Sequence, residues 1–154
     1  MKAIIVNETK EKIPSTLKRD VDEICNYLSS RRLRNGKLLS EKSEITIVFL
    51  TAPEMKRVNS SFRKKNKPTD ILSFASDDPA SIGELLLCPD VLKKQAAVQQ
   101  HTFSDEMKYM LIHGILHLLG YDHELSKSEE KLMFSIQDKA FGMLVQPPVK
   151  KSQK

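Results

Sequence analysis

The sequence has few cysteines and no long apolar segment. Its two cysteines, Cys25 and Cys88, lie far apart and form no CxxC pair, a pattern that predicts reduced, buried thiols without a metal role. No uninterrupted apolar run exceeds the four residues 47–50, whereas a membrane span needs about 18. The start turns polar after residues 3–6, too soon for a secretory segment of about 7 to 15 apolar residues. We therefore expect a cytoplasmic protein that does not cross a membrane.

The size and the charge of the chain narrow the possibilities further. Its 154 residues suffice for one domain, since compact domains cluster near about 100 to 150 residues. The apolar content of 40% is enough for a core without metals or disulfides, so a bound metal is expected to serve function. The 25 basic and 20 acidic side chains leave a net charge of +5. This modest excess favours nucleic acid or an anionic membrane as a partner.

The pattern of apolar residues predicts an α+β fold. Short β-branched or apolar runs predict four strands, at 2–7, 45–50, 71–74 and 84–88. Apolar residues at helical spacing predict helices at about 17–28, 53–62, 90–100, 104–119 and 126–144. Because the helices do not alternate strictly with the strands, one mixed sheet of about four strands packed with several helices is expected. Residues 1–145 are predicted to form a single catalytic domain, and 146–154 a basic, disordered tail.

Three of the four histidines form the pattern HxxxHxxGxxH. His113 and His117 are four residues apart, so on a helix they differ by about 40° and project from one face. Gly120 can end this helix in a left-handed conformation and turn the chain back, which brings His123 to the same point. Three neutral imidazoles leave a zinc ion one open position for water. The pattern predicts a metal site at the end of a buried helix in the C-terminal half.

The residue after the first histidine bears on the chemistry. Metallopeptidases of similar spacing place Glu there as the general base, and this chain has Gly114. The peptidase mechanism therefore fits poorly. Gly inside a helix costs about 1 kcal/mol relative to Ala, so the missing side chain is expected to be useful. Either it leaves room for a bulky substrate beside the metal, or it lets another element pack closely.

A basic segment precedes the third predicted strand. Four cations and no acid lie between Phe62 and Pro68, namely Arg63, Lys64, Lys65 and Lys67. Lys and Arg beside a strand can hold phosphates, and Arg can do so with a bidentate fork. A merely solvated loop has the same composition. A second basic run, 31–37, carries the same two alternatives.

Together these segments resemble a known family. HGxLHLLGYDH at 113–123, NxxFRxKxxPTDxLSF at 59–74 and GELLLC at 83–88 are similar to motifs of the YbeY family, bacterial endoribonucleases that act as ribosomal RNA maturation factors. The resemblance covers about residues 44–124. The chain departs from the family pattern at Glu84, where the family has Asp, and at Ala75, where Pro is common. Both positions lie outside the metal motif.

The resemblance implies a function and a set of site residues. It implies one Zn²⁺ per chain bound by His113, His117 and His123, a functional Arg63, and metal-dependent cleavage of single-stranded RNA. The implied process is maturation of small-subunit ribosomal RNA and ribosome quality control. We expect Arg63 to stabilise charge developing on the phosphate and Arg63, Lys64, Lys65 and Lys67 to bind the RNA. The expected partners are a ribosomal RNA precursor and ribosome or small-subunit components, with the protein acting as a monomer.

Some alternatives stay open at the level of sequence. Two other functions fit the same residues in place of the nuclease. One is a non-catalytic RNA-binding ribosome-assembly factor with a structural metal, and the other is an atypical metallopeptidase. Imidazoles also bind Ni²⁺ and other divalent ions. Asp122 is expected to hydrogen-bond a ligand histidine, and His101 to lie at the surface in a turn between helices. Either water or the RNA 2′-hydroxyl is the attacking group.

Overall fold

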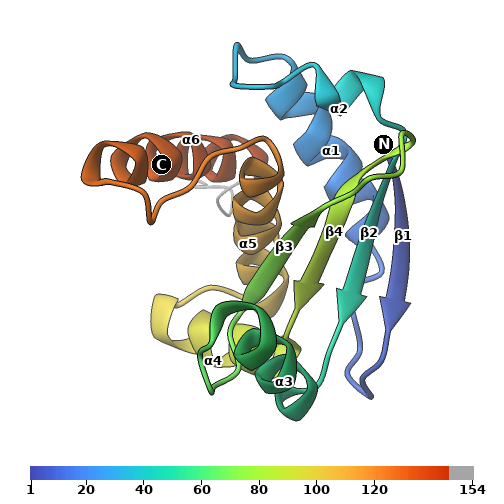
Figure 1. Cartoon of the computed structure of the whole chain (residues 1–154), viewed down its shortest axis with the longest axis vertical. Helices are drawn as coiled ribbons and strands as arrows, with labels where there is room; N and C mark the ends of the chain where they lie inside the picture. Colours follow the sequence, from blue (N-terminus) through green and yellow to red (C-terminus); the bar gives the residue numbers. More distant parts are fainter. Residues whose placement is uncertain (146–154) are drawn as a thin grey trace, which may run out of the picture.

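Four strands form one mixed sheet in the computed structural model, which describes residues 1–145. β1 (Lys2–Asn7), β2 (Glu44–Phe49) and β4 (Ser81–Leu87) are parallel. β3 (Ile71–Ala75) runs antiparallel to β4, so that the order across the sheet is β1-β2-β4-β3. Figure 1 shows β1 and β3 at the two edges. The predicted mixed sheet of four strands is confirmed.

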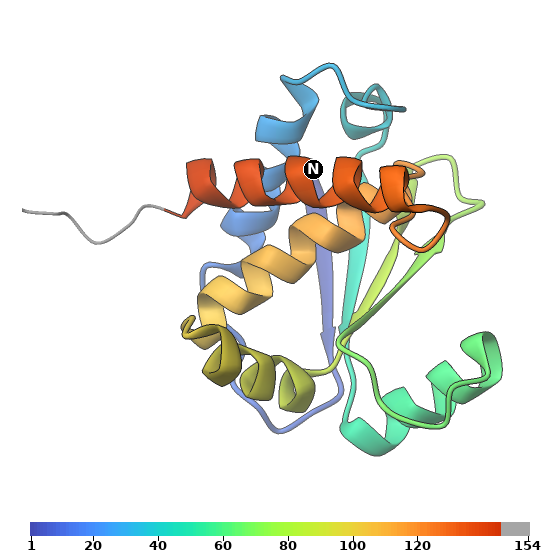
Figure 2. The ribbon, with the colours of Figure 1, turned by 90° about the vertical axis from the view of Figure 1, so that its left-hand side faces the viewer.

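Helices cover the sheet and its ends. They are α1 (Leu17–Ser29), α2 (Leu38–Glu41), α3 (Ala52–Arg63), α4 (Pro89–Gln99), α5 (Phe103–Leu118) and α6 (Lys127–Leu144). α5 contacts β3 and β4, and α6 packs on α5 away from the sheet, as Figure 2 shows. α3 and α4 follow the carboxyl ends of β2 and β4. Among residues 1–145, none of the helices combines the length and the apolar content of a membrane span.

The core lies between the sheet and the helices α1 and α5. Alternate side chains of β2, Ile45, Ile47 and Phe49, are fully buried there. A smaller cluster that includes Leu50 and Met55 forms where α3 begins. This helix starts with the predicted capping box, in which the Thr51 hydroxyl accepts from the Glu54 amide and the Glu54 carboxylate accepts from the Thr51 amide.

The two thiols are buried, as predicted. Cys25 and Cys88 are both free and inaccessible to solvent. Burial raises the pKa of Cys25 to about 12, because the interior disfavours a thiolate. Both side chains therefore act as small apolar core residues.

Gly114 allows α5 to lie close to the sheet. A Cβ atom at Gly114 would lie 2.6 Å from Cδ1 of Ile71 and 2.9 Å from Cδ2 of Leu85. Real Cβ atoms do not approach other heavy atoms so closely, so a side chain here requires the core to shift. Of the two explanations for this glycine, close packing is correct, and the space it leaves is filled by the sheet.

The ends of several elements differ from those predicted. β4 begins at Ser81 rather than at residue 84, because pairing with Glu44 of β2 extends it past Gly83, whose φ is +151°. α2 was not predicted, since a helix of one turn has no apolar periodicity. The predicted tail, 146–154, lies outside the described residues.

Candidate metal centre

Three histidine side chains converge beside the carboxyl end of α5. His113 and His117 project from the helix, and His123 comes from the loop that follows it. One nitrogen of each ring lies within 4.8 Å of one from each of the other two rings. Nε2 of His117 and Nδ1 of His123 are 3.2 Å apart. The structure thus brings together all three residues predicted as ligands, in an arrangement that can hold a metal ion.

The turn that returns His123 to the helix is a Schellman motif. Gly120 has a φ of +101°, and its amide donates to the carbonyl oxygen of His117 at 2.9 Å. The amide of Tyr121 reaches back to the carbonyl oxygen of Leu116 at 3.1 Å. These two hydrogen bonds satisfy carbonyls that the end of a helix leaves free. The left-handed residue expected at Gly120 is present.

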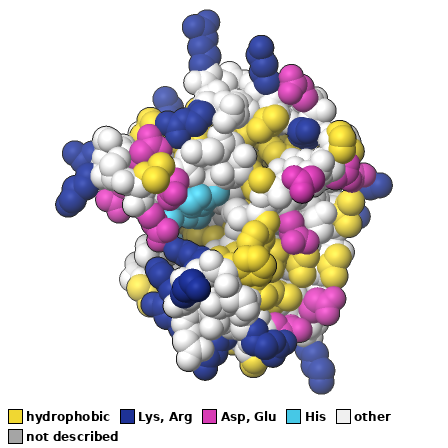
Figure 3. Space-filling model, in the orientation of Figure 1, with side chains coloured by type: hydrophobic (Ala, Val, Ile, Leu, Met, Phe, Trp, Pro, Cys, Tyr) yellow, Lys and Arg dark blue, Asp and Glu magenta, His cyan; other side chains and the backbone are white. Residues whose placement is uncertain are grey.

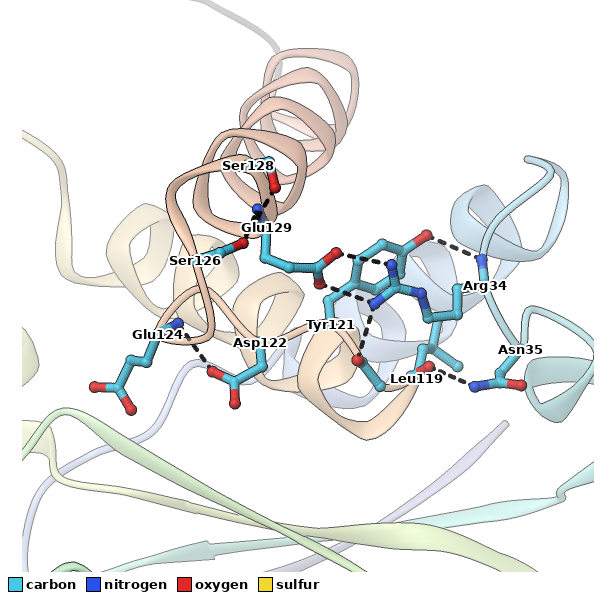
Figure 4. Close-up of polar contacts among 10 residues, drawn as sticks. Arg34, Asn35, Leu119, Tyr121, Asp122, Glu124, Ser126, Ser128 and Glu129 are labelled. Carbon is cyan, nitrogen blue, oxygen red and sulfur yellow. Dashed lines mark hydrogen bonds and ion pairs between the residues drawn. The ribbon is translucent and has the colours of Figure 1, made fainter.

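A loop from the N-terminal part of the chain anchors this turn (Figure 4). Arg34 donates to the carbonyl oxygen of Gly120 at 3.1 Å and pairs with both carboxylate oxygens of Glu129, at 3.0 and 3.1 Å. Its backbone amide donates to the Tyr121 hydroxyl at 2.9 Å. Asn35 donates to the carbonyl oxygen of the residue before Gly120 at 2.8 Å. At Arg34 the second basic run therefore has a structural role.

Gln137 of α6 orients the first histidine of the motif. Its Oε1 lies 2.9 Å from Nδ1 of His113, and its Nε2 donates to the carbonyl oxygen of Tyr109 at 3.2 Å. Since an amide oxygen only accepts, Nδ1 of His113 carries the proton, and its Nε2 keeps a free lone pair for a metal. Gln137 is fully buried. The sequence offered one signal for it, a polar residue on the apolar face of α6 between Met133 and Ala140.

The expected role of Asp122 is wrong. Its carboxylate accepts a hydrogen bond from the backbone amide of Glu124 at 2.9 Å, which shapes the loop around His123. A short carboxylate side chain is well suited to this turn. The hydrogen bond expected from Asp122 to a histidine is made by Gln137 instead.

Burial favours the uncharged form of the two helical histidines, His113 and His117. Desolvation lowers the pKa of His113, although the hydrogen bond that His113 donates to Gln137 opposes this effect. The pKa of His117 falls to about 4, first because of burial and then because His113 and His123 lie nearby. Imidazoles with lowered pKa values are neutral at pH 7, which is the state that binds a metal.

The three histidines open into a cavity of about 470 Å³. Its wall opposite the histidines is formed by the end of α3, the following basic segment and β3, and includes Arg63, Lys65 and Lys67. Lys64 caps α3 in a left-handed conformation with φ +56° and does not line the cavity. Figure 3 shows the histidine surface in a hollow with charged side chains beside it. Two of the three predicted lysines thus share the cavity with the histidines.

Arg63 ends α3 and faces the loop that carries His123. Nη2 of Arg63 donates to both carboxylate oxygens of Glu124, at 2.8 and 3.0 Å. Asn59, fully buried one turn earlier, donates to the carbonyl oxygen of Lys67 at 2.8 Å. Asn59 therefore holds the basic segment against α3, a role that the sequence analysis did not assign.

A second cavity, of about 740 Å³, lies where α4, α5 and α6 meet, and contains none of the three histidines. His101 lines it and is half-buried, with Nδ1 2.9 Å from Oε1 of the buried Glu106. His101 thus lies in the predicted turn between α4 and α5, partly exposed and apart from the three clustered histidines. Ala75 and Glu84, where the sequence departs from the family pattern, lie outside the cavity that contains the three histidines.

Comparisons with known proteins place these features in a family. A family model described as "Endoribonuclease YbeY" matches residues 4–144. A protein of Bdellovibrio bacteriovorus named Endoribonuclease YbeY is 45% identical over 148 residues, covering 94% of this chain and 96% of the relative. A Lactobacillus gasseri protein of the same name is 33% identical, covering 85% and 86%. A solution structure of a Thermotoga maritima protein, 29% identical, superimposes with a TM-score of 0.59 over 92% of this chain and 88% of that one.

Proposed function

This chain belongs to the YbeY family of endoribonucleases, and we propose that it is a zinc-dependent hydrolase that cleaves single-stranded RNA. The process that we propose is maturation of small-subunit ribosomal RNA and ribosome quality control in the cytoplasm, with the protein acting as a monomer on the ribosome or its small-subunit components. One observation carries the proposal. His113, His117 and His123 share a single cavity with Arg63 and two lysines.

The proposed metal ligands are the three histidines, with one Zn²⁺ per chain. When bound, zinc supplies Lewis-acid polarisation of a phosphate oxygen or of water. The protein contributes the orientation of the rings. Gln137 fixes the protonated nitrogen of His113, and the turn at Gly120 fixes the approach of His123. Other divalent ions, Ni²⁺ among them, suit the same imidazole ligands.

Arg63 is the proposed catalytic residue. Its guanidinium already binds a planar pair of oxygens in the Glu124 carboxylate, and a phosphate presents oxygens of similar geometry. We infer that an RNA phosphate replaces this carboxylate, after which Arg63 stabilises the charge that develops on the phosphorus oxygens in the transition state. Lys65 and Lys67 hold neighbouring phosphates in the cavity, and Lys64 contacts the strand outside it.

Cleavage by Arg63→Gln tests this proposal. The protein is purified without a histidine tag, and zinc content and cleavage of a labelled single-stranded RNA are measured on one preparation, before and after chelation. We expect about one metal per chain, loss of cleavage on chelation, and a kcat about 10²- to 10³-fold lower in Arg63→Gln, as when one charge-stabilising donor is removed. Arg57→Gln is the matched control, because Arg57 is exposed on the same helix and outside the cavity.

The outcome separates the candidate functions. If Arg63→Gln binds a full complement of metal but cuts as fast as wild type, the cleavage comes from a contaminant. The non-catalytic assembly factor with a structural metal is then the better description. Peptide hydrolysis that scales with bound zinc would indicate the metallopeptidase. The packing of Gly114 against Ile71 and Leu85 argues against that reading, because the position of the peptidase base faces the sheet.

A further inference from the structure

Phe62 is the one aromatic side chain among residues 1–145 that is mostly exposed. It lies in the last turn of α3 with 68% of its surface open to solvent. The other large exposed hydrophobic side chains of this part of the chain are aliphatic. A phenylalanine ring buries a large apolar area when it is placed in a core. The fold does not use this ring for that purpose.

The ring of Phe62 nevertheless has an aromatic neighbour within the fold. It meets the ring of Phe74, on β3, with centroids 5.1 Å apart and planes at 65°. Such an edge-to-face contact takes up the edge of one ring and one face of the other. At least one face of Phe62 therefore stays open. An aromatic ring has few rotatable bonds, and the contact with Phe74 restricts them further, which lowers the entropy cost when a flat partner stacks on Phe62.

The surroundings of Phe62 are those of a polyanion site. The next residue, Arg63, lines the cavity of the three histidines, and Lys65 and Lys67 line the same cavity. Lys64 adds a further exposed cation. Figure 3 shows hydrophobic surface next to the hollow that holds the histidines. Proteins that bind single-stranded nucleic acid combine these two features, cations for the phosphates and an aromatic face for the bases.

We propose that Phe62 is a stacking platform for one unpaired nucleobase, next to the phosphate that Arg63 binds. This inference rests on the proposed function, since it concerns the same RNA strand. A base inside a duplex is stacked on its neighbours on both sides, so only an unpaired base can reach the ring. Phe62 thereby favours single-stranded over double-stranded substrates. Because every base has a flat face, the contact tolerates any sequence.

A tryptophan reporter tests the contact directly. The chain contains no tryptophan, so Phe62→Trp places a single indole at the proposed platform. Metal-loaded protein is titrated with a single-stranded 2′-O-methyl RNA oligonucleotide, whose integrity is checked on a gel. We expect saturable fluorescence quenching by the single strand and none by the duplex. Val6→Trp is the matched control, because Val6 is 38% exposed on β1, at the opposite edge of the sheet from β3.

Kinetics on natural RNA give a second readout. We expect Phe62→Ala to raise KM for single-stranded RNA about 5- to 150-fold, the range for loss of one stacked base, with a smaller change in kcat. Phe62→Leu keeps apolar bulk without an aromatic face and is expected to behave like Phe62→Ala. Phe62→Tyr keeps the face and is expected to match wild type. Circular dichroism of each variant separates loss of stacking from loss of fold.

Two results would overturn the proposal that Phe62 stacks on an unpaired base. One is a Phe62→Leu variant with wild-type KM, and the other is quenching of Phe62→Trp by duplex as strong as by single strand. Either of these results differs from those expected if the proposed function itself is wrong. If the protein is not the nuclease, Arg63→Gln still shows cleavage, or the wild-type protein binds no RNA. If cleavage depends on Arg63 while all Phe62 variants behave as wild type, only the stacking inference is wrong.

Discussion

Gly114 is the position at which α5 packs against the sheet, next to a histidine that lines the cavity. The neighbouring His113 faces the cavity, while Gly114 faces Ile71 and Leu85 of the sheet. The same single position therefore removes the peptidase base and brings the helix close to the strands. A side chain at this position would compete with the core and not with the substrate.

Replacement of this glycine is expected to destabilise the fold. Gly114→Ala places a Cβ atom within 3 Å of two buried side-chain ends, and overpacking of this kind costs about 1 to 3 kcal/mol. Alanine contributes about 1 kcal/mol of helix propensity relative to glycine, so we expect a net loss of up to about 2 kcal/mol in the free energy of urea unfolding. Gly142→Ala is the control, because Gly142 has open space around it in α6 and is expected to gain about 0.5 to 1 kcal/mol. Equal stabilities of the two variants would contradict this account.

Prediction at the residue scale succeeded where the signal was local. The spacing of His113, His117 and His123 predicted their convergence, because four residues on a helix and a left-handed turn are short-range geometry. Gln137 was missed because it lies 24 residues from His113 in sequence. Asp122 was assigned the wrong partner because adjacency in sequence says little about where a short side chain points.

The elements around the metal centre are tied together by Arg34. It joins the loop after α1 to the end of α5 and, through Glu129, to the start of α6. The interaction with Glu129 lowers the pKa of that carboxylate. The loop that positions His123 thus depends on a residue far from the histidine motif in sequence.

Loss of this anchor is expected to weaken metal binding. Arg34→Met keeps a long side chain but removes every donor to Gly120 and Glu129. We expect about 10-fold weaker zinc binding, the lower end for partners that orient ligands, measured by competition with a chelating dye. Arg32→Met is the control, because Arg32 is exposed in the same basic run. If both variants bind zinc equally well, His123 is positioned without Arg34.

Strands and helices were largely predictable as elements. Long periodic segments such as α5 and α6 and the capped start of α3 follow from propensity and local hydrogen bonds. The start of β4 was not predictable in this way, because Ser81 joins the strand only through pairing with Glu44 of β2. Tertiary contacts decide such ends.

At the scale of the whole molecule, the order of the strands was beyond sequence reasoning. β4 inserts between β2 and β3 although β3 precedes it in the chain. Local patterns identify strands, whereas their order depends on pairing between distant residues and on the helices that must cover the sheet. The spacing of apolar residues predicted the α+β class, whereas it did not predict the order of the strands in the sheet.

The hydrophobic core contains none of the three histidines, so removal of zinc is expected to lower stability without unfolding the protein. Zinc at 100 times its Kd should add about 2.7 kcal/mol to the free energy of unfolding, which for a domain of this size raises Tm by about 5 to 10 °C. Calorimetry of metal-depleted and zinc-loaded protein measures the shift, and His123→Ala should abolish it. A metal-depleted chain without a cooperative transition would instead show that the metal is structural.

The anchors of the histidines also fix when the site is assembled. Arg63 and the basic segment are synthesised before α5 and α6, whereas the ring of His113 is oriented only once Gln137 of α6 has been made. A domain folds as a unit during translation, so the cavity, which Phe134 and Gln137 help to line, is complete only after α6 has joined the fold. A nascent chain therefore carries the cations of the basic segment well before its three histidines have the orientation seen in the folded protein.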